Sequence, residues 1–238
     1  MTTSKIDNSQ RTAAKVAGWS GLLTFAIVVF GNYVLLNPLI VSGNVAATAQ
    51  NIAQHQTQVR MTVVCFLTYS LGVVVLLSAL YVILKPVNPG LALAGALFRL
   101  VFALLWLLSP LNLLSALRLL SNANYLQVFE PGRLQALARL HVAAGFDDYY
   151  VGLPFFGLAA TVCAWLWLKS NYIPGGLAIF GIIASVWCVI CAFVYLVFPD
   201  FAKPVNPYWF DSPMALFEMV LSFWLLFKGL KQPEIAAT

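Results

Sequence analysis

The chain alternates between long apolar segments and shorter polar stretches. Six of the apolar segments are close to the ~20 residues that a helix needs to cross the ~30 Å hydrocarbon core of a bilayer. They are Ala17–Leu36, Met61–Leu84, Leu91–Leu108, Tyr150–Leu168, Gly176–Phe198 and Pro213–Phe227. Each is expected to be helical, because unpaired backbone groups are too costly in lipid. The pattern therefore predicts an all-α fold, a polytopic integral membrane bundle of six transmembrane helices.

Two of these segments need a closer look at their ends. The third is expected to continue past Pro110 to Leu120, with a kink where proline removes a backbone donor. The first follows basic residues, as a signal peptide would, but its apolar stretch exceeds the usual 7–15 residues of a signal core. We therefore expect the first segment to remain in the protein as a span.

Two of the polar connections are long enough to carry helices of their own. Residues 44–58 predict a polar surface helix with Asn44 as its N-cap. Residues 130–146 predict an amphipathic outer-loop helix that begins at Pro131 and repeats its apolar positions at 3.6-residue spacing. Such a helix is expected to lie on the membrane or on the outer mouth of the bundle.

The composition supports a membrane protein. Hydrophobic residues make up 61% of the chain and charged residues 9%, whereas globular domains have about 45–50% and about 25%. So few charges cannot cover a water-exposed surface, so the expected partner is the lipid bilayer. The sequence has no lysine- or arginine-rich block that would grip phosphate backbones, which argues against nucleic acid as a partner.

Loop charges predict the orientation, because basic residues are enriched on the cytoplasmic side. If both termini share one side, that side carries seven basic residues: Lys5, Arg11, Lys15, Lys85, Lys169, Lys228 and Lys231. The other side carries five: Arg60, Arg118, Arg133, Arg139 and Lys203. The pattern therefore predicts a multi-pass protein of the cell membrane with both termini cytoplasmic. Its expected parts are a cytoplasmic tail at 1–16, the transmembrane domain at 17–230 and a second cytoplasmic tail at 231–238.

Two ionisable residues lie inside the expected spans, Arg99 in the third and Glu218 in the sixth. A charge at mid-membrane costs about 2.5–3.5 kcal/mol even on lenient insertion scales, so it should face protein or water. Small residues share the helical face of Arg99 and leucines lie opposite it, and small residues mark the packing side of a membrane helix. Both charges are therefore expected to point into the bundle and to form an intramembrane polar site.

The surroundings of the two charges are alike. KPVNP occurs at 85–89 and again at 203–207, and each copy is followed by ALFRLV (96–101) or ALFEMV (215–220). The copies follow the second and the fifth span and so fall on opposite faces of the membrane. This arrangement is typical of a three-plus-three inverted repeat, which is frequent in transporters. The alternative is a coincidence within a restricted apolar alphabet.

Whether the two charges pair is left open by the sequence. Counted at 1.5 Å per residue from the expected helix starts, Arg99 lies ~12 Å from the inner edge and Glu218 ~8 Å from the outer edge. This leaves ~10 Å between them along the membrane normal. Extended side chains can bridge that distance, but helical side chains lean toward their own N-terminus, and here they lean apart. Otherwise Glu218 meets His141, Arg118 or water.

His141 is the other candidate site residue. It lies on the apolar face of the expected 130–146 helix and is followed by Asp147 and Asp148. A histidine beside a carboxylate can move protons, although a lone interfacial histidine is more often only packed. We expect no metal and no cofactor, because no second histidine or cysteine stands near His141. The four cysteines, at 65, 163, 188 and 191, fall in apolar runs and are expected to be small buried side chains.

Several segments together resemble one protein family. They are LKPVNPGLALAGALFRL (84–100), HVAAGFDDYYVGLPFFGL (141–158), LKSNYIPGGLAIFGIIAS (168–185) and FEMVLSFWLLFKG (217–229). They are similar to a mainly bacterial family of six-span membrane proteins known only as a domain of unknown function, numbered four-three-eight-six. The resemblance implies a six-helix membrane fold and no reaction. The family tends to carry a second acid a few residues after the arginine, where this chain has Phe102 and Ala103, which favours Glu218 as the partner of Arg99.

Three functions follow as hypotheses. In the first, the protein binds or moves a small molecule or ion through a site lined by Arg99 and Glu218. In the second, it is a membrane-embedded enzyme acting on a lipophilic substrate, with Glu218, His141 and Asp147 as acids or bases; no nucleophile or metal-ligand motif supports it. In the third, it is a structural or accessory protein whose ion pair only fixes helix register. The sequence gives no substrate and no oligomeric state.

Overall fold

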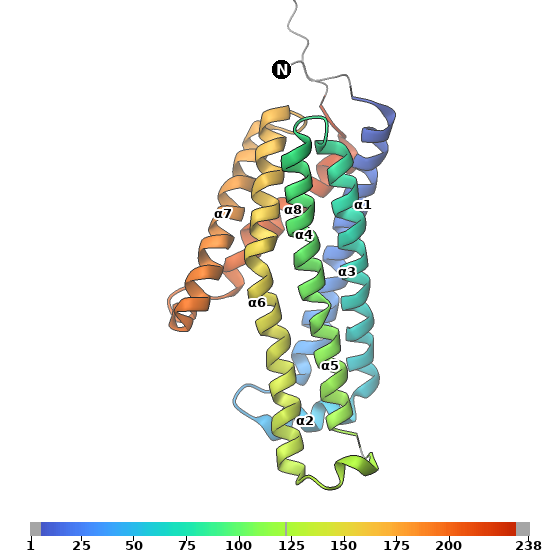
Figure 1. Cartoon of the computed structure of the whole chain (residues 1–238), viewed down its shortest axis with the longest axis vertical. Helices are drawn as coiled ribbons and strands as arrows, with labels where there is room; N and C mark the ends of the chain where they lie inside the picture. Colours follow the sequence, from blue (N-terminus) through green and yellow to red (C-terminus); the bar gives the residue numbers. More distant parts are fainter. Residues whose placement is uncertain (1–5, 122, 232–238) are drawn as a thin grey trace, which may run out of the picture. The chain divides into compact units, whose positions relative to one another are not determined.

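The computed structural model describes residues 6–121 and 123–231, and all regular secondary structure in them is helical. The α-helices are α1 Asn8–Val29, α2 Val45–Gln54, α3 Gln56–Leu84, α4 Pro89–Trp106, α5 Leu108–Leu119, α6 Pro131–Ser170, α7 Gly175–Val197 and α8 Tyr208–Phe227 (Figure 1). A π-helix, Phe30–Leu36, continues α1, and short 3₁₀ turns lie at Asn37–Leu39, Asn124–Leu126 and Pro199–Ala202.

Six helical segments of the described chain are long and apolar enough to cross a membrane. They are Asn8–Leu39, Gln56–Leu84, Pro89–Leu119, Pro131–Ser170, Gly175–Val197 and Tyr208–Phe227. The predicted all-α, six-span architecture is therefore confirmed, and the chain is a multi-pass membrane protein.

Internal contacts divide the chain into two units, each considered by itself. The first unit comprises Met1–Leu23, Gly72–Ala103 and Tyr150–Thr238, and it contains α7 (orange) and α8 (red) of Figure 1. The second unit comprises Thr24–Leu71 and Leu104–Tyr149, and it contains α2 and α5. Each unit takes residues from both halves of the chain, so this division does not follow a three-plus-three split. The inverted repeat stays a prediction.

Helix α1 begins at Asn8, nine residues before the expected start of the first span. Asp7 and Gln10 cap it reciprocally: the Gln10 amide donates to Asp7 Oδ1 (2.7 Å), and the Asp7 amide donates to Gln10 Oε1 (3.2 Å). The expected tail at 1–16 therefore includes the first turns of α1. Residues 1–5 and 232–238, which complete the two expected tails, lie outside the described residues.

The buried core of the first unit joins α1, α3, α4, α6, α7 and α8. Gln10, which is only 3% exposed, links three segments at one end of this core. Its side-chain amide donates to the Ile83 carbonyl (3.0 Å) and to the Tyr172 hydroxyl (3.3 Å). The Lys231 amide donates to the Tyr172 carbonyl (2.8 Å), just beyond α8. The start of α1 and the ends of α3 and α8 therefore meet at the α6–α7 connection.

The polar connection before α3 has the expected surface helix, α2. Asn44 is its N-cap, and its side chain accepts a hydrogen bond from the Ala47 amide (2.9 Å). In the same unit Gln58 donates to the Leu35 carbonyl (2.7 Å), which links the start of α3 to the π-helix.

The third span is broken, as the proline predicts, although the break lies at Leu107 rather than at Pro110 itself. A helical proline clashes with the carbonyl four residues earlier, which here belongs to Trp106, the last residue of α4.

The outer-loop helix expected over 130–146 is not a separate element, and this expectation needs correction. It forms the first part of α6, which runs without interruption for 40 residues. Gly145 does not break the helix because it is packed against α5: the Ser109 hydroxyl donates to the Gly145 carbonyl (2.8 Å). At 1.5 Å per residue, α6 is about 60 Å long, twice the hydrocarbon thickness of a bilayer.

Candidate functional site

Arg99 lies on the buried face of α4 and is 3% exposed. Of the small residues that share its face, Ala96 is half-buried and the others are buried: Ala92, Gly95 and Ala103. The leucines on the opposite face are about half exposed: Leu93 (49%), Leu97 (52%) and Leu104 (54%). The arginine therefore points into its unit, as the spacing of small residues predicts.

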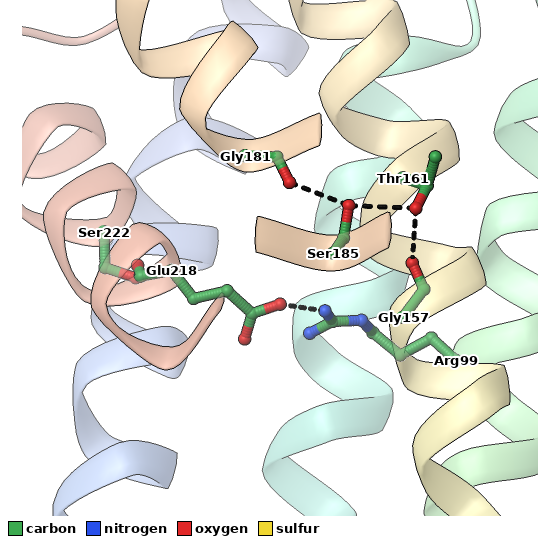
Figure 2. A network of polar contacts seen from close by, with 7 residues as sticks. All are labelled: Arg99, Gly157, Thr161, Gly181, Ser185, Glu218 and Ser222. Atoms are coloured by element: carbon green, nitrogen blue, oxygen red, sulfur yellow. Dashed lines mark hydrogen bonds and ion pairs between the residues drawn. The ribbon is translucent and has the colours of Figure 1, made fainter. Parts of the chain in front are cut away.

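Arg99 and Glu218 form an ion pair in the first unit. Arg99 Nη2 donates a hydrogen bond to Glu218 Oε1 (Figure 2). The sequence leaves this contact open, and the structure brings the two residues together across 119 positions of sequence.

The starts of the two helices explain how the ~10 Å offset closes. Helix α8 begins at Tyr208, five residues before the expected Pro213, and α4 begins at Pro89, two before the expected Leu91. At 1.5 Å per residue these shifts place Glu218 about 7.5 Å and Arg99 about 3 Å deeper. Each charge is then the eleventh residue of its helix.

The two partners differ in exposure. Only 4% of the Arg99 side chain is exposed, against 26% of the Glu218 side chain. Glu218 lies on the buried face of α8 with Met214, Leu221 and Ser222. The exposed face of α8, with Leu216, Val220 and Phe223, is opposite. Glu218 therefore points away from the exposed face and is still a quarter exposed, so it is the more accessible member of the pair.

An aromatic pair covers the guanidinium. Arg99 Cζ lies 4.8 Å from the centre of the Phe156 ring, and Phe156 stacks on Phe102 (4.7 Å between ring centres, 16° between planes). A cation over an aromatic face gains about 0.5–2 kcal/mol. On another side a cavity of about 10 Å³ is lined by Arg99, Gly95 and Cys163 among others. That volume is close to what one water molecule needs.

Glycines let the helices of the first unit approach closely. A Cβ on Gly157 of α6 would lie 2.6 Å from Val189 Cγ2 and 3.0 Å from the Ser185 carbonyl of α7. A Cβ on Gly181 of α7 would lie 2.5 Å from the Phe217 ring of α8. The backbone positions of α6, α7 and α8, and with them Phe156 and Glu218, therefore depend on residues without side chains.

Two side-chain hydroxyl groups, of Thr161 and Ser185, make hydrogen bonds at the α6–α7 contact. Thr161 Oγ1 lies 2.8 Å from the Gly157 carbonyl and 2.9 Å from Ser185 Oγ, and Ser185 Oγ donates to the Gly181 carbonyl (2.7 Å) (Figure 2). Our sequence reasoning matched Gly157 to the family pattern without giving it a role, and it missed Thr161, Gly181 and Ser185. The signal was available, because GLAAT (157–161) and GIIAS (181–185) are small-xxx-small motifs of the kind that mark contacts between membrane helices.

His141 belongs to the second unit, where it joins a different polar group. Its Nδ1 lies 3.0 Å from Asn112 Oδ1, and Asn112 Nδ2 donates to Asp148 Oδ2 (2.8 Å). Asp147, the acid that the sequence reasoning named, is exposed, and its neighbour Asp148 makes the contact. Asn112 was missed, since an asparagine inside an apolar run gives no recognisable motif.

His141, Asn112 and Asp148 thus form a polar network within the second unit. Of the two residues that the enzyme hypothesis joins at one substrate, His141 belongs to the second unit and Glu218 to the first. Asn112 Oδ1 can only accept, so Nδ1 of His141 carries the proton of this hydrogen bond. Its other ring nitrogen, Nε2, then accepts when the ring is neutral.

Residues 6–121 and 123–231 hold no group of three or more histidines, cysteines or acids that could bind a metal ion. The cysteines are free thiols; Cys188 and Cys191 are buried in α7, and Cys65 and Cys163 are half-buried.

The model of a family described as a domain of unknown function (DUF4386) matches residues 16–229. The chain belongs to the DUF4386 family. The resemblance drawn from the sequence is thereby confirmed, and the DUF4386 match includes Arg99, His141 and Glu218. A relative from Archaeoglobus fulgidus, an uncharacterized protein, is 28% identical over 161 residues, which cover 67% of this chain and 78% of the relative. No solved structure matches the chain. The DUF4386 description names no reaction, so function has to be argued from the site residues.

Proposed function

We propose that this DUF4386 member binds a small monovalent cation or a proton at Glu218, with Arg99 as the resident counter-ion that the cation replaces. The proposal rests on the unequal exposure of the pair, 26% for the acid and 4% for the arginine. The proposal includes the predicted setting: a cell membrane, with both termini cytoplasmic.

The more exposed member of the ion pair determines whether the expected ligand is an anion or a cation. An incoming anion would have to reach a guanidinium that is almost completely covered. An incoming cation meets an acid whose side chain is a quarter exposed. Arginine keeps its charge under all physiological conditions, so the exchange takes place at the acid.

Arg99 keeps part of its stabilisation when the Glu218 carboxylate binds another cation. The Phe156 ring lies 4.8 Å from Arg99 Cζ and stays over the cation. The ring therefore supports a state in which Glu218 binds another cation, at a modest cost to the arginine. A protein that moves its ligand would alternate between these two partners of Glu218.

A second candidate is a purely structural ion pair that fixes the register of α4 against α8. The cavity beside Arg99 favours it, because about 10 Å³ accommodates about one water and no larger ligand. If Glu218 binds a cation, function requires the carboxylate at position 218. If the pair is structural, stability requires only that an ion pair is present.

A charge-swapped variant separates the two candidates. Arg99→Glu combined with Glu218→Arg keeps an ion pair but moves the acid to the covered side. The wild type and the swap are purified in lipid nanodiscs, and their thermal unfolding is followed with Na⁺ or K⁺ at constant ionic strength, with a bulky organic cation as replacement. Glu218→Gln serves as a second loss-of-site variant.

Cation binding predicts a rise in the wild-type melting temperature that saturates with concentration. At ten times the dissociation constant the gain is about 1.4 kcal/mol, or about 3–6 °C for a chain of this size. The swap and Glu218→Gln should lose this response. For protons alone, the wild type should instead show proton uptake that the swap lacks. The exposed pair Lys203–Asp200, swapped in the same way, should change nothing. If the wild type shows neither response and the Arg99/Glu218 swap is as stable as wild type, the pair is structural.

A further inference from the structure

The two ends of the first unit carry opposite charge. The terminus end is the end where α1 starts and where α3 and α8 finish, at the α6–α7 connection. Among the described residues it has one acid, Asp7, and six basic residues: Arg11, Lys15, Lys85, Lys169, Lys228 and Lys231. The α8-start end, where α7 finishes and α8 begins, has two acids, Asp200 and Asp211, and one basic residue, Lys203. Such a charge distribution repels cations at the terminus end and attracts them at the α8-start end.

Asp211 lies on the same face of α8 as Glu218. The two residues are seven positions apart, which is nearly two full turns and about 10.5 Å along the helix axis. This face is the buried one: it includes Met214 (0% exposed), whereas Trp209 (63%) and Leu216 (49%) lie opposite. Asp211 is half-buried there. An acid on a buried face is costly unless it interacts with other groups, so its position calls for an explanation.

Helix α7 runs beside both acids. Its residue Cys188 interacts electrostatically with Asp211 and with Glu218. The contact between α7 and α8 continues at Gly181, where an added Cβ would lie 2.5 Å from the Phe217 ring. Asp211 and Glu218 therefore share one environment, along α7, rather than facing different neighbours.

Two features on the terminus side of Glu218 oppose the passage of a cation. One turn beyond Glu218, α8 packs directly against α1: a Cβ on Gly18 would lie 2.9 Å from the Ser222 carbonyl and 2.6 Å from Leu226 Cγ. The cavity of about 10 Å³, between the end of α3 and the start of α4, is lined by Arg99. A cation there would meet the guanidinium before the carboxylate, and like charges repel. The α8-start end is therefore the favourable direction of approach.

We propose that the cation reaches Glu218 from the α8-start end and that Asp211 attracts and positions it. This role depends on the proposed function, because it requires a cation that binds at Glu218. Asp211 raises the local concentration of cations at the start of α8. Its carboxylate also lowers the energy of a cation at Glu218 through the field alone, without contacting the bound ion. Asp211 is thus a positioning residue for the site at Glu218.

Asp211 has an alternative role, because it lies in the first turn of α8. An acid there stabilises a helix through the helix dipole. An acid that only stabilises the helix changes the melting temperature equally at every cation concentration. An acid that attracts the cation changes the concentration at which the cation response is half-maximal, and added salt screens its effect. Measuring affinity as well as stability separates the two roles.

Coulomb's law gives the size of the expected effect. At about 10.5 Å, one unit charge changes the affinity for a cation by about two-fold at the dielectric constant of water, and by about fifteen-fold at an effective dielectric constant of 20. A half-buried acid lies between these limits, so Asp211→Asn should weaken cation binding by about five-fold. Asp211→Glu keeps the charge and should bind the cation as the wild type does.

The test uses the full chain in lipid nanodiscs, with Na⁺, K⁺ and protons as the probes. The dissociation constant is measured for whichever of these the wild type binds, at low and at high ionic strength set with a bulky organic cation. Asp200→Asn is the matched control, because Asp200 lies at the same end but is 86% exposed and paired with Lys203 (2.8 Å). Lys85→Gln is the control at the terminus end.

Asp211→Asn should raise the dissociation constant about five-fold at low ionic strength and less at high ionic strength, while both controls match the wild type. Asp211→Ser replaces Asp211→Asn should that variant not fold, since serine is also favoured at helix starts. The role of Asp211 is overturned if Asp211→Asn binds the cation as Asp200→Asn does, or if Lys85→Gln has the larger effect. A wild-type response that Glu218→Gln lacks then still supports the proposed function. A wild type that binds none of the three cations refutes both.

Discussion

Replacing either member of the Arg99–Glu218 pair by methionine should cost unequal amounts of stability. Methionine is unbranched and apolar, so it fills the space without introducing a new polar group. Arg99→Met leaves an acid that is a quarter exposed and can be hydrated. Glu218→Met leaves a guanidinium that is 4% exposed and cannot lose its charge.

The exposed fractions of the two side chains determine how much unfolding free energy each variant should lose. Removing one partner of a buried ion pair costs about 3–5 kcal/mol, and Glu218→Met should reach this range. Arg99→Met should cost less, about 1–3 kcal/mol for an acid without its partner, with about 0.5–1 kcal/mol more for the lost contact with Phe156. The double variant should lie within about 1 kcal/mol of wild type or above it, because an apolar pair of similar volume replaces the ions.

Equilibrium unfolding in bicelles measures these differences. The exposed pair Lys203–Asp200, at 2.8 Å, is the control, and its single methionine variants should stay within about 1 kcal/mol of wild type. Equal deficits for the two core variants, or a larger deficit for Arg99→Met, would show that the burial of the pair is not unequal in the way described.

Two further predictions concern the scaffold and the second polar group. Gly157→Ala should destabilise the protein by about 1–3 kcal/mol, because its Cβ meets the Ser185 carbonyl at 3.0 Å. The control, Gly132→Ala, should not destabilise it, because a Cβ at Gly132 meets nothing within 4 Å. Equal thermal unfolding of the two variants would contradict the close α6–α7 contact. Asn112→Ala should cost about 1–3 kcal/mol and change the tautomer of His141, because the bridge to Asp148 is lost; an unchanged ring-nitrogen NMR spectrum of His141 would contradict the network.

The sequence predicted those features that depend on periodicity. Spans of bilayer length and the small-residue face of Arg99 follow from apolar spacing along one helix, and the N-cap at Asn44 follows from local hydrogen bonding. Helix starts were predicted less well. Asp7 and Gln10 begin α1 early through a capping pair, and α8 starts at Tyr208 despite Pro213 in its second turn. Those starts decide whether Arg99 and Glu218 are level, so an error of five residues left the contact undecided.

The features that the sequence did not predict depend on contacts between distant segments. Asn112 joins His141 to Asp148 from another helix, and nothing near Asn112 in the sequence indicates this role. Thr161 and Ser185 meet because Gly157 lets α6 approach α7 closely. The continuity of α6 was missed for a related reason: residues 130–146 and the fourth span were treated as separate helices, whereas Ser109 of α5 holds Gly145 within one helix.

The separation of the ion pair along the chain has a consequence for biogenesis. Glu218 follows Arg99 by 119 residues, and a ribosome that adds about 5–20 residues per second needs about 6–24 s to reach it. During that interval α4 enters the membrane with an arginine whose acid has not been synthesised. The nascent chain therefore depends on the translocon, or on an insertion factor beside it, to shelter this residue until the last helix arrives.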